Sequence, residues 1–322
     1  SDVLDPSTGA VQAQVHLGDA ALLDQAIESA KKAQPDWAAV NPQRRARVLF
    51  RYKELIEAHM DELAALLSSE HGKVIADAKG DVQRGLEVVE FACGIPHLLK
   101  GDYTQGAGPG IDVYSMRQPL GIVAGITPFN FPAMIPLWMF PMAIASGNTF
   151  ILKPSEQDPL TPMRLAELFE EAGAPKGVLQ VVHGGKEQVD VLLTDPAIKA
   201  VSFVGSVPVG RYIYETGTRN MKRVQSFAGA KNHMVIMPDA NMDQVVDALM
   251  GAGYGSAGER CMAVAVPVPV GKQVADNLMD RMVPLVEELP VGPPDDSKAA
   301  MGPIITRQSL ERITSLLQSG VD

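Results

Sequence analysis

From Gly121 onward, short apolar runs alternate with helix-like segments, and this alternation limits the possible folds more than any other feature. The apolar runs are Gly121–Thr127, Asn148–Leu152, Val178–Val182, Ala200–Val204 and Met234–Met237. The segments between them with helical spacing are Met134–Ala145, Pro162–Ala172, Lys186–Leu193 and Val209–Thr216. Apolar strands separated by helices predict an α/β fold with a doubly wound parallel sheet. Such sheets bind ligands beyond the carboxyl ends of their strands.

The first third of the chain is predicted to be helical. Apolar residues recur every three or four positions in Asp24–Ala33, Arg44–Ser69 and Ala76–Leu99. A glycine-rich stretch, Gly101–Gly110, then interrupts the pattern. A second region is expected to begin near Gly229, so 322 residues fit two domains.

Charge and cysteine content exclude several classes of protein. The net charge of −10 argues against a nucleic-acid partner. The chain has only two cysteines, so no disulfide framework is expected, and a reducing, cytoplasmic location is predicted. Neither cysteine belongs to a metal-binding pattern, so no metal site is predicted. The apolar stretch Phe129–Ser146 contains three prolines, which favours a buried loop and helix over a membrane span.

The glycine motifs are weak evidence when taken alone. A GxGxxG fingerprint is absent, and Gly205–Gly210 has P-loop glycine spacing, but Arg211 and Tyr212 replace the Lys-Ser/Thr pair. An NTPase is therefore not predicted. The turn from Ala200–Val204 into a helix through Gly205 and Ser206 would still suit a pyrophosphate, because helix N-termini present free N–H groups.

Cys261 stands out from the usual buried cysteine. Without context, a lone cysteine is most often a small packing residue, and Cys93 fits that interpretation. Cys261 follows the sequence Gly-Ser-Ala-Gly-Glu-Arg, whose small residues allow close backbone approach. The adjacent Arg260 would favour a reactive thiolate.

Four motifs together resemble the aldehyde dehydrogenase superfamily in order and spacing, over essentially the whole chain. They are Pro128-Phe-Asn-Phe-Pro132, Leu152-Lys-Pro-Ser-Glu156, Phe203-Val-Gly-Ser206 and Gly258-Glu-Arg-Cys261. The resemblance implies an NAD-binding domain over 1–228, with an oligomerisation hairpin inserted at 100–118, and a catalytic domain over 229–322. A later family motif, Glu-Glu-Ile-Phe-Gly-Pro, does not occur, so the catalytic domain is expected to be C-terminally incomplete.

The resemblance also implies roles for individual residues. Cys261 would attack the aldehyde, and the Asn130 amide would hold the resulting oxyanion together with the Cys261 backbone N–H. A carboxylate at Glu156 would repel a 2′-phosphate, so NAD is expected rather than NADP. Without the motifs, Asn130 would be a turn residue, and Lys153 and Glu156 would be solvated charges. The expected cofactor-binding residues are Thr127, Phe129, Lys153, Ser155, Glu156, Gly205, Ser206 and Val209.

The sequence departs from hydrolytic members of the family at two proton-handling positions. Phe227 stands where those members carry a glutamate base, and Met139 where they often carry a lysine. Arg84 and Arg260 could clamp a substrate carboxylate, although Arg84 could equally lie on a solvated helix face. These features resemble the CoA-acylating methylmalonate-semialdehyde dehydrogenase branch, which implies coenzyme A as co-substrate and release of CO2.

Three alternatives stay open at this point. The chain could be a hydrolytic aldehyde dehydrogenase, a non-catalytic protein with the same fold, or a fragment that binds NAD without turnover. The resemblance implies a homo-oligomer, either a dimer or a tetramer. It implies a small semialdehyde as the other partner.

Overall fold

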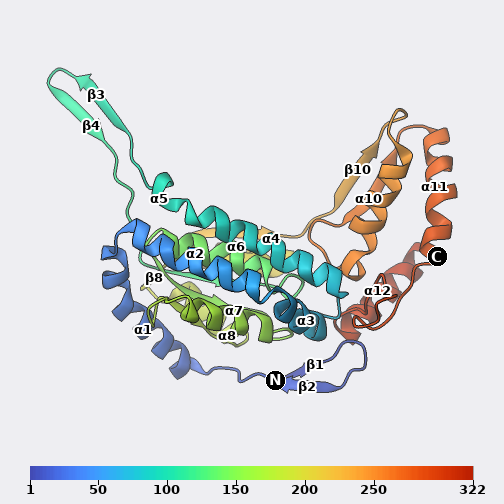
Figure 1. Cartoon of the computed structure of the whole chain (residues 1–322), viewed down its shortest axis with the longest axis horizontal. Helices are drawn as coiled ribbons and strands as arrows, with labels where there is room; N and C mark the ends of the chain where they lie inside the picture. The colour runs from blue at the N-terminus through green and yellow to red at the C-terminus, as the bar shows by residue number, and fades with distance from the viewer. Residues whose placement is uncertain (322) are drawn as a thin grey trace. The chain divides into compact units, whose positions relative to one another are not determined.

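A five-stranded parallel sheet, in the order β7-β6-β5-β8-β9, organises much of the computed structural model, which describes residues 1–321. The strands are β5 (Ile122–Ile126), β6 (Thr149–Lys153), β7 (Leu179–Val181), β8 (Ile198–Gly205) and β9 (Arg223–Ala228). Connecting helices are α6 (Met134–Ala145), α7 (Leu160–Glu171), α8 (Lys186–Thr194) and α9 (Val207–Arg219) (Figure 1). The predicted parallel α/β architecture is confirmed.

Two compact units make up the described chain. The first contains Ser1, Val15–Leu63 and Asp81–Ala228, and the second contains Asp2–Gln14, Ala64–Gly80 and Gly229–Asp322. A change of unit therefore falls between Ala228 and Gly229. The second unit also includes two segments from the first 80 residues, which sequence periodicity does not reveal.

Helices cover the sheet of the first unit on both faces. On one face, α1 (Ala20–Ala39) packs with α8, and their apolar residues join those of the strands in one core cluster. On the other face, α2 (Pro42–Ala58) packs against α6 and α7 (Figure 1). All ten residues of β5 and β6 are buried, as expected for strands covered on both sides.

An aromatic cluster fills the core beneath α2. Tyr52 of α2 makes an edge contact with Phe169 of α7, and Phe140 of α6 lies against both rings and against Phe150 of β6. The Tyr52 hydroxyl donates to the carbonyl of Leu165 at 3.0 Å, so this buried polar group is satisfied.

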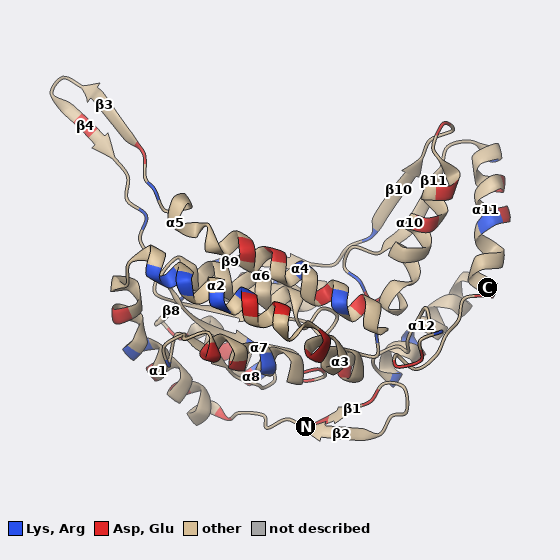
Figure 2. Cartoon of the chain, viewed as in Figure 1, with Lys and Arg blue, Asp and Glu red and all other residues tan. Residues whose placement is uncertain are grey.

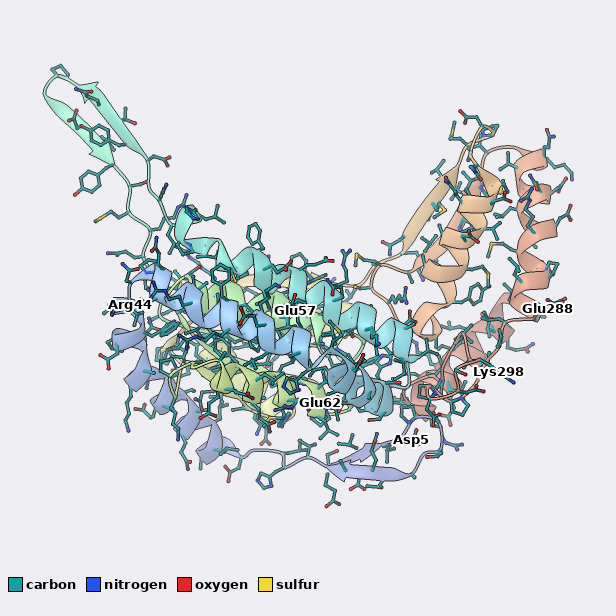
Figure 3. The ribbon with its side chains drawn as sticks, in the orientation of Figure 1. Asp5, Arg44, Glu57, Glu62, Glu288 and Lys298 are labelled. Atoms are coloured by element: carbon teal, nitrogen blue, oxygen red, sulfur yellow. The ribbon has the colours of Figure 1, made fainter. Side chains whose placement is uncertain are left out.

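The exposed face of α2 is charged, while one arginine on the other side is buried. Arg44, Arg47 and Arg51 are exposed, and Figure 2 shows basic residues along this helix. Arg44 near the start of α2 and Glu57 near its end are labelled in Figure 3. Arg45 is buried and donates from Nε to the carbonyl of Ala145 at 3.0 Å, which ties α2 to the end of α6.

Two of the predicted helices are each divided in the structure. The segment expected over Arg44–Ser69 is α2 followed by α3 (Met60–His71), because α2 ends before His59, whose φ of −104° and ψ of 17° leave the helical range. The segment expected over Ala76–Leu99 is α4 (Ile75–Cys93) followed by the short α5 (Ile95–Leu98), with a break at Gly94.

The glycine-rich stretch forms an antiparallel hairpin of β3 (Tyr103–Gly108) and β4 (Ile111–Tyr114). The side chains of Tyr103, Ile111, Val113 and Tyr114 are exposed. The proposed role of this hairpin in oligomerisation stays a prediction.

The second unit has two small sheets and three long helices of its own. Strands β1 (Asp2–Leu4) and β2 (Val11–Gln14) pair antiparallel, and β10 (Asn232–Ile236) and β11 (Val264–Pro269) pair parallel. Its helices are α10 (Met242–Tyr254), α11 (Lys272–Glu287) and α12 (Arg307–Val321). The core of this unit consists of Ile236, Val246, Leu249, Val274 and Leu278.

The aromatic cluster should dominate the stability of the first unit. We expect Phe140→Ala to lower the free energy of unfolding by about 3–5 kcal/mol, because the ring is 1% exposed and leaves a cavity. Phe91→Ala is the matched control, since Phe91 is a helical phenylalanine that is 56% exposed and should change stability by less than about 0.5 kcal/mol. Urea denaturation followed by circular dichroism would compare the two, and equal losses would contradict this account of the core.

Candidate active site

The strand order places a topological switch point between β5 and β8. From β5 the chain moves outward through β6 and β7, and it then returns to the other side of β5 as β8 and β9. The carboxyl ends of neighbouring parallel strands lie at one edge of the sheet, which is where such folds bind ligands. The expected cofactor-binding residues lie at the carboxyl ends of β5, β6 and β8 or soon after them, at this edge.

The segments after β5 and β6 are joined directly. The backbone N–H of Thr127 donates to the carbonyl of Lys153 at 3.1 Å, and both residues are buried. The Lys153 ammonium lies 3.1 Å from Oε2 of Glu156, whose side chain is 46% exposed. The Ser155 hydroxyl accepts from the N–H of Gln157 at 3.1 Å. The structure thus brings Thr127, Lys153, Ser155 and Glu156 together.

A glycine inside α9, the helix that follows β8, lets this helix pack closely against β9. A Cβ on Gly210 would lie 2.7 Å from the Cβ of Ala228, so a larger residue would push α9 away from β9. The N-cap residue Ser206 makes no side-chain hydrogen bond to the helix, and Ser206 and Val209 are exposed. Pro208 has no N–H, so the N–H groups of Val207 and Val209 are the ones at the start of α9 that are available to an anionic ligand.

His183 is a residue of this edge that sequence reasoning missed. It follows β7, is 9% exposed, and neither ring nitrogen has a hydrogen-bond partner among residues 1–321. Burial lowers the pKa of His183 to about 4, with a further lowering by the charge of Lys153 and an opposing effect of Glu156. A buried polar ring without a partner needs an explanation, and its place after a predicted strand was a usable signal.

Asn130 and Phe129 follow β5 and are half-buried. Arg84 lies on α4 with its side chain 61% exposed, and its Nε is 3.7 Å from Oε2 of Glu87. These three residues belong to the first unit, whereas Cys261 and Arg260 belong to the second. The proposed pairings of Asn130 with Cys261 and of Arg84 with Arg260 therefore stay predictions.

Cys261 lies in the second unit, after a tightly wound segment. Ser256 and Ala257 have φ values of 51° and 53°, which is uncommon for residues other than glycine. A Cβ on Gly255 would lie 2.4 Å from Nη2 of Arg260, so this position must lack a side chain if the guanidinium is to pack there. The Arg260 Nη2 donates to Asp77 Oδ1 at 2.7 Å, and Nη1 donates to the carbonyl of Gly251 at 3.1 Å.

Asn232 forms hydrogen bonds with the backbone at Cys261 and just after it. Its side-chain amide donates to the carbonyls of Cys261 and Ala263 at 3.0 and 2.9 Å. It therefore joins the start of β10 to the segment that leads into β11. The sequence analysis assigned no role to this asparagine.

The two cysteines differ in environment. Cys93 is buried, and burial raises the pKa of its thiol to about 11, with a further contribution from the charge of Glu90. Cys261 is only partly buried. The packing role expected for Cys93 agrees with this environment.

Phe227 and Met139, the two residues that depart from hydrolytic relatives, lie in different surroundings. Phe227 is on β9 and is 56% exposed. Met139 is buried in α6, and its sulfur would lie 2.9 Å from a Cβ placed on Gly125 of β5. Neither side chain can accept or donate a proton.

Glu259 is a second titratable residue that the sequence analysis left without a role. Burial raises its pKa to about 7, while the N–H of Ile305 at 3.4 Å from Oε2 and the charge of Lys73 act in the opposite direction. The carboxyl group is therefore partly protonated near neutral pH.

Two other features do not occur among residues 1–321. No three His, Cys, Asp or Glu side chains gather there as a metal ion would require. No helix in that part of the chain combines the length and apolar character needed to cross a membrane.

Known relatives resemble the chain along all of its length. A malonate-semialdehyde dehydrogenase of Pseudomonas aeruginosa is 54% identical over 321 residues, which cover 100% of this chain and 65% of the relative. Malonate-semialdehyde dehydrogenase 2 of Geobacillus thermodenitrificans is 51% identical and is covered to 66%. The chain thus spans about two thirds of the length of these relatives.

Solved structures also resemble the chain along nearly all of its length. A crystal structure assigned as a methylmalonate-semialdehyde dehydrogenase of Sinorhizobium meliloti 1021, complexed with NAD, has a TM-score of 0.98 and 62% identity, covering 100% of this chain and 65% of that one. The methylmalonate-semialdehyde dehydrogenase of Oceanimonas doudoroffii gives a TM-score of 0.97 at 52% identity, with 99% and 65% covered. The family model described as "Aldehyde dehydrogenase family" matches residues 1–322, and the chain therefore belongs to the aldehyde dehydrogenase family.

Proposed function

We propose that the whole protein oxidises malonate or methylmalonate semialdehyde with NAD and transfers the acyl group to coenzyme A. The relatives' names support the substrate class, since those at about half identity are malonate-semialdehyde dehydrogenases. The observation that carries the choice of acyl acceptor is the apolar character of both Phe227 and Met139. With no proton acceptor at either position, water is poorly activated as a nucleophile.

The groups at the carboxyl ends of the strands support the proposal that NAD binds there. The uncapped N-terminus of α9 suits a pyrophosphate, and Lys153, Glu156 and the buried His183 ring offer donors and acceptors for hydroxyl groups. Thr127, Phe129, Ser155, Gly205, Ser206 and Val209 are proposed as the remaining cofactor-binding residues. When bound, the cofactor supplies the acceptor for the hydride of the aldehyde.

Cys261 is proposed as the nucleophile. Its thiolate sulfur forms a bond to the aldehyde carbon, and the carbonyl oxygen becomes an oxyanion that accepts hydrogen bonds from the Asn130 amide and the Cys261 N–H. Loss of hydride from that carbon restores the carbonyl and leaves a thioester on Cys261. Arg84 and Arg260 are proposed to bind the substrate carboxylate.

The acyl group carries its carboxylate one carbon away from the thioester carbonyl. Breaking that carbon–carbon bond releases CO2 and leaves the electron pair on the carbon next to the thioester, which then takes a proton. The coenzyme A thiolate attacks the resulting acetyl or propionyl thioester, and Cys261 leaves as the thiolate. The products are acetyl-CoA or propionyl-CoA.

One observation favours hydrolysis as a second candidate. Glu259, with a pKa raised to about 7 by burial, is two residues from Cys261 and has the pKa of a general base. Its known contact is with the N–H of Ile305. Hydrolysis through Glu259 is therefore the alternative that the following experiments must separate from acyl transfer.

Alkylation should modify one cysteine of the two. With a pKa of about 11, Cys93 has about a hundredfold less thiolate than an ordinary cysteine, and it is buried. We expect brief iodoacetamide treatment near pH 8 to label Cys261 alone, as read by peptide mass spectrometry, and to remove turnover. Cys261→Ser should block both labelling and turnover, whereas Cys93→Ser should preserve them. Labelling of Cys93 at a similar rate would contradict the description of its environment.

Deacylation should need coenzyme A. Stopped-flow mixing of the full-length protein with NAD and malonate semialdehyde should give an NADH burst of about one equivalent per active site, followed by slow release. Coenzyme A should restore steady turnover, because its thiol is already partly ionised, whereas water lacks the 10²–10⁴-fold benefit typical of a general base. Glu259→Gln provides the control. A linear trace that coenzyme A does not change, and that Glu259→Gln slows, would instead establish the hydrolytic reading.

Glu156 should set the preference for NAD over NADP. Glu156→Gln removes the charge that would repel a 2′-phosphate, so the ratio of kcat/KM for NAD to that for NADP should fall by about tenfold, equivalent to about 1.4 kcal/mol. Glu171→Gln is the control, because Glu171 is an exposed glutamate at the C-terminal end of α7. Steady-state kinetics with both cofactors would decide, and equal use of the two by the unmodified protein would refute the assignment of Glu156.

A further inference from the structure

Asp77 contacts both ends of the segment that leads to Cys261. It lies in the first turn of α4, in the part of this helix that belongs to the second unit. Its Oδ2 accepts from the backbone N–H of Ser256 at 2.9 Å and is 3.3 Å from the Ser256 hydroxyl. Its Oδ1 accepts from Nη2 of Arg260 at 2.7 Å. One carboxylate therefore connects two residues four positions apart.

The backbone at Ser256 and Ala257 needs contacts from other parts of the chain to keep its conformation. Ser256 and Ala257 are both left-handed, and such residues persist only where surrounding contacts impose the conformation. The N–H of Ser256 points to Asp77, so the first of the two residues is held by that carboxylate. Without it, the local sequence gives no reason for this backbone path.

The same carboxylate orients the Arg260 side chain. The guanidinium is planar, so fixing Nη2 on Asp77 and Nη1 on the carbonyl of Gly251 also fixes the direction of its other N–H groups. One N–H on each of these two nitrogens has no partner among residues 1–321. The side chain is 24% exposed, so these two donors can reach a ligand.

We infer that Asp77 is a positioning residue: it fixes the backbone before Cys261 and directs the two remaining N–H donors of Arg260 toward a substrate carboxylate. The inference rests on the proposed function for the roles of Cys261 and Arg260. It assigns to Asp77 no contact with the substrate. Its consequence is that Asp77 contributes to selectivity for acidic aldehydes through Arg260, whereas its bond to the Ser256 N–H affects all aldehydes alike.

The test uses the full-length protein with Asp77→Ala, Asp77→Asn and the control Asp276→Asn. Asp276 also pairs with a basic side chain, but on the exposed surface of α11. We expect Asp77→Ala to raise KM for malonate semialdehyde at least tenfold more than KM for propanal. Asp77→Asn keeps an oxygen acceptor, so it should lose less selectivity, and Asp276→Asn should lose none. Circular dichroism checks that each variant folds.

A double-mutant cycle separates positioning from a general structural effect. In an Arg260→Ala background, Asp77→Ala should cause no further change in the ratio of the two KM values, because its effect passes through Arg260. Equal changes in KM for both aldehydes, or an undiminished effect of Asp77→Ala without Arg260, would overturn the inference.

A second readout does not depend on turnover or on coenzyme A. Asp77→Ala should lower the rate at which anionic iodoacetate alkylates Cys261 relative to neutral iodoacetamide, because Arg260 then no longer directs its N–H donors toward an anion. An unchanged ratio of the two alkylation rates would overturn the inference as well. If instead the unmodified protein does not distinguish the semialdehyde from propanal while this ratio falls in Asp77→Ala, the proposed substrate is wrong and the placement of Asp77 stands.

Discussion

Burial of β5 and β6 on both faces is the constraint on which the rest of the first unit depends. Parallel strands of this kind must be covered by helices on each side, and every residue of both strands is buried. Side chains with chemistry can then stand only where the strands end. Lys153 is the last residue of β6, and Thr127 and His183 follow β5 and β7, so the demands of packing decide where a ligand can bind.

The sequence was sufficient to predict the features that follow from periodicity. The bounds of α6, Met134–Ala145, were predicted residue for residue, because its apolar character and its flanking turns agree. Strand β9 was not identified as a strand, since Arg223–Ala228 alternates between exposed and half-buried residues and carries charge. The break at His59 was also missed, because the apolar stripe continues through it.

The site was predictable where a motif marked it and not where contacts alone define it. The segments around Lys153, Ser206 and Cys261 could be located from sequence, because each belongs to a motif with recognisable order and spacing. Asn232 and Asp77 are distinguished only by the hydrogen bonds that they make, and His183 only by the burial of its unpaired ring. Asp77 lies 183 residues from Arg260, and no local pattern indicates that the two side chains meet. Contacts between residues so far apart become visible only in three dimensions.

The division of the chain into units has a consequence for its synthesis. The second unit contains Asp2–Gln14 and Ala64–Gly80 as well as residues beyond 228, so some of its earliest residues leave the ribosome long before the rest. Asp77 cannot meet Ser256 until about 180 further residues have been made. Domains commonly form in order during translation. Here the first unit can fold around its sheet before the residues beyond 228 have been made. Until then, the apolar residues of Asp2–Gln14 and Ala64–Gly80 lack the rest of the second unit to pack against, so a chaperone could bind them.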